Sequence, residues 1–263
     1  MLFVKQDLNH NCVTKNTSGA NFRKILKSKS SITSVQAPRI YAIHDRALTI
    51  EFSSSISEEI NLLVMRLHAS LEEKSFDGFI ESVPAYSSLT VYFNEDVSIK
   101  KVETTLLEYY NEFIASSTNN SNPIESVKHI IPVCYDAEFG LDLEEVATTC
   151  KLSIQEVITM HTSIAFRVYM IGFVPGFAYM GTLPISLETK RKNNPRLAVP
   201  EGSVAIAGLQ TGIYPATIPG GWNILGKTPV KMLDKSKDPC SFLQAGDIVQ
   251  FKSITKNEFE SYL

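Results

Sequence analysis

Three segments rich in glycine, proline and aromatic residues are the part of this sequence best suited to chemistry. They span residues 172–181, 194–203 and 210–222. Glycine and proline hold backbone shapes that other residues adopt only with strain. Aromatic walls beside a few polar groups are typical of a small-molecule pocket. We therefore expect a binding site here, the alternative being barrel corners whose aromatic side chains belong to the core.

The side chains expected to line this pocket come mostly from the same segments. They are Phe173, Pro175, Gly176, Phe177, Tyr179, Ser203, Gln210, Thr211, Tyr214, Gly220, Gly221, Trp222 and Lys227. Arg196 adds a cation to the second segment. His161 is the best candidate for a general acid or base, because it precedes the strand that leads into residues 172–181. A structural histidine with satisfied hydrogen bonds is the alternative.

Other catalytic and metal-binding patterns find little support. Residues 221–228 match the phosphate-binding pattern GxxxxGK[ST], which requires a preceding strand and a following helix. Pro215 and Pro219 precede the match and Pro229 follows it, so we do not expect a P-loop. The four cysteines and five histidines are scattered without metal-ligand spacing, so we expect no metal site and free thiols in a reducing cytoplasm.

Composition restricts the class of protein that positions these residues. The chain has 263 residues, 44% of them hydrophobic and 20% charged, which favours a folded protein with a sizeable core. A net charge of −3 gives no electrostatic reason to expect nucleic-acid or anionic-membrane binding. No apolar run approaches the roughly 18 residues of a membrane-spanning helix. We expect a cytoplasmic protein.

Residues 1–37 differ from the rest of the chain. They carry six basic residues and one acidic residue, together with many Ser, Asn and Thr. They lack the apolar stretch of a secretion signal. A disordered basic extension is the main expectation, and a basic leader or a misassigned start codon are the alternatives.

The following residues, 38–135, have the pattern of a small α/β domain. Strands are predicted over 40–42, 47–52, 78–83, 89–93 and 127–133, helices over 60–71 and 99–113, and a loop over 116–122. This order indicates a split βαβ, ferredoxin-like sheet with helices on one side. Residues 136–163 should connect as two short helices, because Asp142-x-x-Glu145 and Ser153-x-x-Glu156 are capping-box patterns.

Residues 164–263 have the composition and pattern typical of an all-β barrel or sandwich. Residues 172–246 hold 10 of the 13 Gly and 8 of the 12 Pro. Short β-rich runs alternate there with turn signals, and no helix longer than two turns fits between Gly172 and Gly246. The predicted fold class is therefore α+β, an N-terminal α/β domain followed by a barrel.

The same segments resemble a known family. The runs "IGFVPGFAYMGTLP" and "NNPRLAVPEGSVAIAGLQTGIYPATIPGGWNILGKTP" are similar to the carboxyltransferase-like family that includes the 5-oxoprolinase B subunit, the kinase inhibitor KipI and the first allophanate-hydrolase-type subunit. "HDRALTIEF", "VPAYSSLTVYF" and "FGLDLEEVA" extend the resemblance over about residues 38–255. It implies an N-terminal ferredoxin-like domain followed by a cyclophilin-like β-barrel.

The resemblance also implies an activity. This would be the ATP-dependent opening of 5-oxo-L-proline to L-glutamate, by a complex in which this chain is inactive without its partners. The partners would be a companion carboxyltransferase-like protein (the C-type component, like KipA) and an A-type component (LamB/YcsF type). ATP would be a substrate of the complex, bound by this chain or by a partner, and the chain could also self-associate.

Roles follow for individual residues in such a reaction. Arg196 and Lys227 would contact anions, and His161 would transfer protons. Ser203, Gln210 and Thr211 would orient the substrate. The alternatives are a KipI-like inhibitor of a sensor histidine kinase and a urea- or amide-carboxylating component of the allophanate-hydrolase type.

Overall fold

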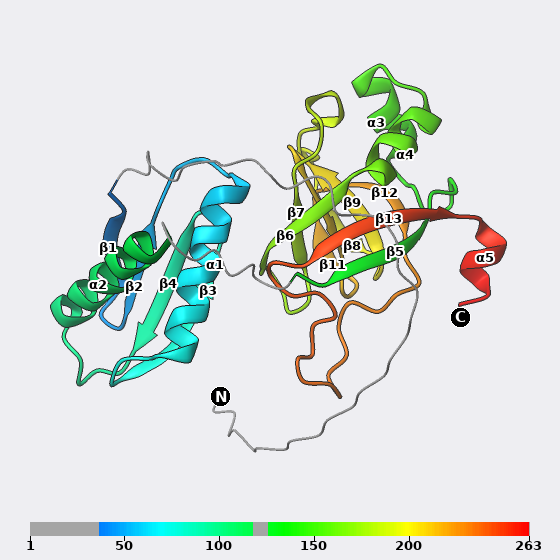
Figure 1. Cartoon of the computed structure of the whole chain (residues 1–263). Coiled ribbons are helices and arrows are strands. Elements are labelled where there is room, and N and C mark those ends of the chain that lie inside the picture. The colour runs from blue at the N-terminus through cyan, green and yellow to red at the C-terminus, as the bar shows by residue number, and fades with distance from the viewer. Residues whose placement is uncertain (1–36, 118–125, 263) are drawn as a thin grey trace, which may run out of the picture. The chain divides into compact units, whose positions relative to one another are not determined.

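The computed structural model describes residues 37–117 and 126–262. Their first part is an antiparallel sheet of four strands in the order β1-β2-β4-β3. Its elements are β1 (Arg39–His44), β2 (Ala47–Glu51), α1 (Glu58–Glu73), β3 (Phe79–Pro84), β4 (Ser88–Phe93) and α2 (Ile99–Ser117). Figure 1 shows α1 and α2 over the same face of this sheet.

Apolar spacing explains how this sheet and its helices pack. In β4, Leu89, Val91 and Phe93 are fully buried, whereas Tyr92 points to the other face and is 36% exposed. Helix α1 buries an apolar stripe at helical spacing, and the Ser57 hydroxyl caps it by accepting from the Ile60 N–H. Because β4 lies between β2 and β3, the arrangement β2-α1-β3 is the split βαβ motif that the sequence predicts.

The second part is a closed barrel of seven strands in the order β10-β7-β6-β13-β5-β12-β9. The strands are β5 (Lys128–Cys134), β6 (Ala165–Ile171), β7 (Ala178–Gly181), β9 (Ser203–Ala207), β10 (Gln210–Ile213), β12 (Asn223–Lys227) and β13 (Ile248–Ile254). Strands β8 (Arg196–Val199) and β11 (Ile218–Gly220) form a separate two-stranded sheet. The predicted α+β fold, a sheet domain followed by a barrel, is confirmed.

The prediction that the strand over 127–133 belongs to the N-terminal α/β domain is wrong. This strand is β5, and it runs parallel to β13 with Lys128 opposite Ile248 and Cys134 opposite Ile254. On its other side it meets β12 at the pair Cys134–Lys227. A seven-residue register with a strand about 120 residues away along the sequence holds β5 in the barrel.

Two short helices, α3 (Leu143–Cys150) and α4 (Ile154–Ser163), lie between β5 and β6 as predicted. The capping box at Ser153 is formed: its hydroxyl accepts from the Glu156 N–H, and the Glu156 carboxylate accepts from the Ser153 N–H. The predicted box at Asp142 is wrong, because this N-cap residue makes no side-chain capping bond. Its carboxylate instead binds residues of β8 and β12.

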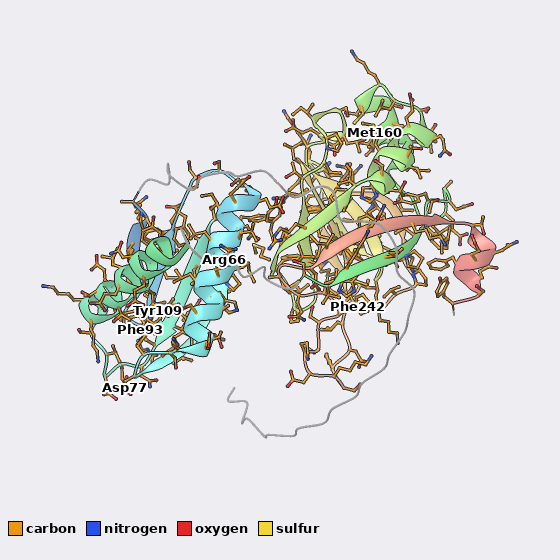
Figure 2. The ribbon with its side chains drawn as sticks, viewed as in Figure 1. Arg66, Asp77, Phe93, Tyr109, Met160 and Phe242 are labelled. Carbon is orange, nitrogen blue, oxygen red and sulfur yellow. The ribbon has the colours of Figure 1, made fainter. Side chains whose placement is uncertain are left out.

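The remaining elements are short. Between Gly172 and Gly246 the described helix content is one 3₁₀ turn, η1 (Ile185–Leu187), as the glycine and proline content predicts. Helix α5 (Lys256–Glu260) follows β13. Figure 2 labels Met160 on α4 and Phe242 on the long connection before β13.

Two predicted segments lie wholly or partly outside the described residues. The basic extension over 1–37 is outside them except for Ala37, and so are residues 118–122 of the predicted loop; Ser116 and Ser117 end α2. Within residues 37–117 and 126–262, no helix combines the length and apolar character needed to cross a membrane. No group of three or more His, Cys, Asp or Glu in these ranges is placed to hold a metal ion.

Candidate functional site

The predicted aromatic residues come together at the turns between the barrel strands. Phe177 meets three rings edge-on, with centroid distances of 4.7 Å to Tyr179, 5.2 Å to Tyr214 and 5.5 Å to Trp222. Tyr179 also meets Trp222 at 5.7 Å, and Phe173 meets Phe177 at 5.8 Å. Edge-to-face geometry is favourable for aromatic pairs. We call these five residues the aromatic cluster.

The turn that begins the cluster holds Phe173 in a strained conformation. Its φ is +67°, in the left-handed region that a bulky side chain rarely adopts. The Val174 N–H donates to the Gly172 carbonyl over 2.8 Å, which makes this a three-residue γ-turn. Phe173 is nevertheless 62% exposed, and Pro175 beside it is exposed as well. Strain in an exposed aromatic residue is typical of functional turns.

Two predicted glycines are required by space or backbone shape. A Cβ on Gly220 would lie 2.3 Å from the Tyr214 hydroxyl oxygen. Gly176 has φ +84°, and a Cβ there would meet the Met232 carbonyl at 3.1 Å. Gly221 has more room, because its nearest neighbour would be Pro195 at 3.5 Å. The glycine at 220 therefore lets the β11 backbone approach the Tyr214 ring.

Arg196 is engaged by a buried carboxylate rather than open to an anion. Its two terminal nitrogens donate to Asp142, each over 2.8 Å, and Lys192 donates to the same carboxylate over 2.8 Å. The Ile224 N–H adds a fourth bond of 2.8 Å. Burial alone would raise the pKa of Asp142, but these hydrogen bonds outweigh it and hold the pKa below its usual value. The network ties β8 to the start of α3.

His161 lies fully buried on the inner side of α4, with its ring stacked on Phe251 at 4.5 Å. Its Nδ1 is 2.8 Å from the Tyr135 hydroxyl, and its Nε2 is 2.9 Å from the Thr211 hydroxyl. Because Thr211 donates to the Ala205 carbonyl, it accepts from His161, which places the imidazole proton on Nε2. Burial lowers the pKa of His161 to about 3. The ring is therefore neutral.

The other predicted polar residues are spread around the barrel wall. Ser203 is 2% exposed at the start of β9, and its carbonyl accepts from the Tyr214 N–H. The Lys227 ammonium lies 5.9 Å from the centre of the Phe139 ring, which packs on Phe259 of α5. Gln210 is half-buried at the start of β10. The structure thus gathers the aromatic residues and places Arg196 beside Tyr214, where each charge affects the pKa of the other group. The side chains of His161 and Lys227 instead contact Tyr135, Thr211 and Phe139.

Two residues beside the cluster were missed by the sequence analysis. The Arg191 guanidinium carbon lies 5.9 Å from the centre of the Trp222 ring. Tyr86, from the turn between β3 and β4, lies 5.6 Å from Tyr169 and 6.0 Å from Tyr179 by ring centroids. Tyr86 lies within the run "VPAYSSLTVYF", which resembles the family, and this position could have marked it as a candidate site residue. Arg191 is one of four cations within residues 190–196, and this concentration of positive charge could have marked it as a candidate anion contact.

The position of Tyr86 is fixed by a buried amide. Asn61 of α1 is 0% exposed and donates to the carbonyls of Ala85, Tyr86 and Tyr169 over 3.1–3.3 Å. The Arg167 Nε donates to the Asn61 carbonyl oxygen over 3.3 Å. The Tyr86 hydroxyl itself is buried and has no hydrogen-bond partner among the described residues.

These features define a class of protein: an α+β chain in which a small antiparallel sheet domain precedes a closed barrel with an aromatic cluster at its turns. Residues 38–243 match the family "Carboxyltransferase domain, subdomain C and D", and the chain belongs to this family.

Individual relatives refine the comparison. The chain is 40% identical over 235 residues to the 5-oxoprolinase B subunit of Bacillus subtilis (strain 168), covering 85% of this chain and 96% of that protein. It is 35% identical over 217 residues to the 5-oxoprolinase B subunit of Escherichia coli O157:H7, covering 82% and 96%. The crystal structure of TTHA0988 is similar with a TM-score of 0.67 and 34% identity over 80% of this chain. The match spans about two fifths of TTHA0988, 40% of its length.

Proposed function

We propose that this chain is the B subunit of a 5-oxoprolinase, which opens 5-oxo-L-proline to L-glutamate at the expense of ATP. The observation that carries this proposal is the 40% identity to a B subunit over 96% of that protein's length. The aromatic cluster lies within the matched residues 38–243, as does the network around Asp142. The likeness therefore includes the candidate site as well as the fold.

The reaction explains why a complex is needed. A lactam is stabilised by resonance, so phosphorylation of its oxygen by ATP makes the ring carbon open to attack by water. Water adds to that carbon, the C–N bond breaks with the amine as leaving group, and a second water releases phosphate from the acyl phosphate. The products are glutamate, ADP and phosphate. Such a site needs cationic and hydrogen-bonding groups for carboxylate and phosphate.

The geometry supports specific roles for residues of this chain. At the barrel turns Phe173 is exposed and Tyr179 and Gln210 are half-buried, so these side chains would contact the substrate. Phe177, Tyr214 and Trp222 are at most 4% exposed and would support them from the core. Arg196 and His161 are held by Asp142 and by Tyr135 and Thr211, respectively, so we assign them positioning roles. Because residues 223–227 form strand β12, the GxxxxGK[ST] match lacks the helix of a P-loop. We infer that a partner protein supplies most of the ATP site.

Partners of the C type and the A type would complete the active site. The match to TTHA0988 supports a need for additional protein, because in that chain the equivalent residues are joined to further sequence. The test is ATP-dependent glutamate release from 5-oxoproline, with this chain alone and with the two partners co-expressed. We expect activity in the mixture and its loss when this chain is omitted. Folded proteins without activity in any combination would refute the proposal.

A further inference from the structure

The unpaired polar groups beside the aromatic cluster point to a ligand. Of the four cations in residues 190–196, Lys192 and Arg196 are paired with Asp142, and Lys192 also with Glu145. Arg191 is exposed and has no acidic partner among residues 37–117 and 126–262; its observed contact is the Trp222 ring. A guanidinium on an aromatic ring is well suited to receive a planar carboxylate in a bidentate contact.

The charge of Arg191 reaches the phenols of the cluster. Burial raises the pKa values of Tyr179 and Tyr214, and the nearby Arg191 guanidinium offsets part of each rise. The same holds for the pKa of Tyr86. Arg191 therefore lies where its field acts on three hydroxyl-bearing rings at once. An anion bound at this guanidinium would lie within the same group of rings.

Tyr86 supplies a second unsatisfied group. A buried hydroxyl without a partner is unfavourable and rare in folded proteins. Gln210 is close enough to Tyr86 to favour the ionised phenol, yet it forms no hydrogen bond of ordinary geometry with the hydroxyl. Asn61 fixes the backbone at Tyr86 with two hydrogen bonds, so the hydroxyl is held in place without a partner among the described residues. A ligand with an amide group would satisfy it.

We propose that Arg191, Tyr86 and Gln210, together with the rings of Tyr179 and Trp222, form the subsite for the carboxylate-bearing lactam substrate. This inference rests on the proposed function. Arg191 holds the carboxylate, and Tyr86 and Gln210 bond the lactam N–H and carbonyl. The half-buried Tyr179 ring covers the methylene groups, and the buried Trp222 ring supports Arg191. One unpaired cation suits a monoanionic carboxylate better than a polyphosphate, which prefers several cations or a ring of backbone amides.

The first test is Arg191→Gln in the complete complex. We expect the KM for 5-oxoproline to rise roughly tenfold to a hundredfold, as for loss of a hydrogen-bonded charge, with the KM for ATP within about twofold. Lys190→Gln is the matched control, because Lys190 is an adjacent exposed cation whose side chain has no observed contact among the described residues. Arg191→Lys should recover part of the loss, since it keeps the charge without the planar fork.

A substrate lacking the carboxylate separates binding from general damage. In the wild-type complex, kcat/KM should be much lower for 2-pyrrolidinone than for 5-oxoproline. In the Arg191→Gln complex, kcat/KM should be nearly the same for the two substrates, because the carboxylate has already lost its partner. Equal KM values for Arg191→Gln and Lys190→Gln would overturn the inference and leave the proposed function standing. A rise confined to the KM for ATP would overturn it too, by assigning the cation to the nucleotide. An inactive wild-type complex would remove both proposals.

The second variant, Tyr86→Phe, distinguishes a ligand-binding hydroxyl from a structural one. Because it removes a buried hydroxyl that has no partner among the described residues, we expect an unchanged or higher melting temperature. The KM for 5-oxoproline should nevertheless rise about threefold to tenfold, as for loss of a neutral hydrogen bond. A lower melting temperature with an unchanged KM would show that the hydroxyl serves the fold and would overturn its role.

Discussion

Asp142 illustrates how one side chain can organise several loops. It is almost fully buried, yet it accepts four hydrogen bonds, from Arg196 (two), Lys192 and Ile224. Removing one partner from a buried charged network leaves the other charges unbalanced. The residue therefore matters more for holding β8 and β12 in place than for starting α3.

Asp142→Asn should accordingly lower the free energy of unfolding by about 2 kcal/mol, less than for a fully buried pair because Arg196 and Lys192 reach solvent. Urea unfolding at neutral pH measures this change. Glu145→Gln is the control, because that carboxylate is 65% exposed and should change stability by less than about 0.5 kcal/mol. Equal effects of the two substitutions would show that the Asp142 network adds little.

His161 gives a pH-dependent prediction. Its pKa in the folded protein is lowered to about 3, so the unfolded chain binds a proton more readily than the folded chain. The free energy of unfolding is therefore highest, as far as this group is concerned, above the ordinary histidine pKa, and it falls as the pH drops from there toward 3. We expect this residue to add a slope approaching about 1.4 kcal/mol per pH unit below about pH 6.

Urea unfolding of wild type and His161→Gln between about pH 7 and pH 4 measures that slope. The variant should be less stable at neutral pH, because the bonds to Tyr135 and Thr211 are disturbed, but its stability should depend less on pH. Parallel curves for the two proteins would contradict a buried neutral imidazole.

At the scale of elements, the turn before β12 depends on close backbone approach. Gly220→Ala would place a methyl carbon 2.3 Å from the Tyr214 hydroxyl oxygen, so β11 or the Tyr214 ring would have to shift. We expect a loss of roughly 2 kcal/mol in stability, within the range for overpacking. Gly221→Ala, whose Cβ would have ordinary contacts, should cost less than about 1 kcal/mol. Thermal unfolding of the two neighbouring variants compares them, and similar losses would argue against the clash.

Elements defined by local patterns were predictable, whereas their partners were not. Alternating residues in β4 and helical spacing in α1 come from nearby positions, so their burial follows from the sequence. Strand β5 was identified as a strand, but its partner β13 lies about 120 residues further on, and no local signal distinguishes that pairing from a place in the first sheet.

The candidate site divides in the same way. Local composition identified the aromatic turns, because glycine, proline and aromatic residues are adjacent in the sequence. It did not reveal that Arg196 is taken by Asp142, 54 positions earlier, or that Tyr86 from the sheet domain meets Tyr179 of the barrel. Ion pairs between residues far apart in the sequence determine which cations remain open to a ligand. The spacing of residues along the chain does not predict these pairs.

At the scale of the whole molecule, Asn61 bonds residues from both structural parts. Its amide donates to Ala85 and Tyr86 in the sheet domain and to Tyr169 in the barrel, and its oxygen accepts from Arg167. One nitrogen of the buried Arg167 guanidinium already has no partner among the described residues. Loss of the Asn61 acceptor would leave that cation further unsatisfied.

Asn61→Ala should therefore lower stability by about 3 kcal/mol and separate the unfolding of the two parts. Differential scanning calorimetry should show one transition for the wild type and two for the variant. Asn61→Asp is the companion substitution, because a carboxylate keeps an acceptor for Arg167 and loses the donors to the three carbonyls. A single sharp transition in Asn61→Ala would mean that the two parts unfold together without this residue.

The position of Trp222 has a practical consequence for spectroscopy. The sequence contains one tryptophan, and its indole lies within the aromatic cluster, edge-on to Phe177 and Tyr179 and close to the Arg191 cation. Indole emission from this chain therefore originates at a single place. A spectral change at denaturant concentrations that leave the far-ultraviolet circular dichroism intact would reveal loosening of these turns ahead of global unfolding. Trp222 therefore serves as an intrinsic fluorescent probe at the place where we propose that the substrate binds.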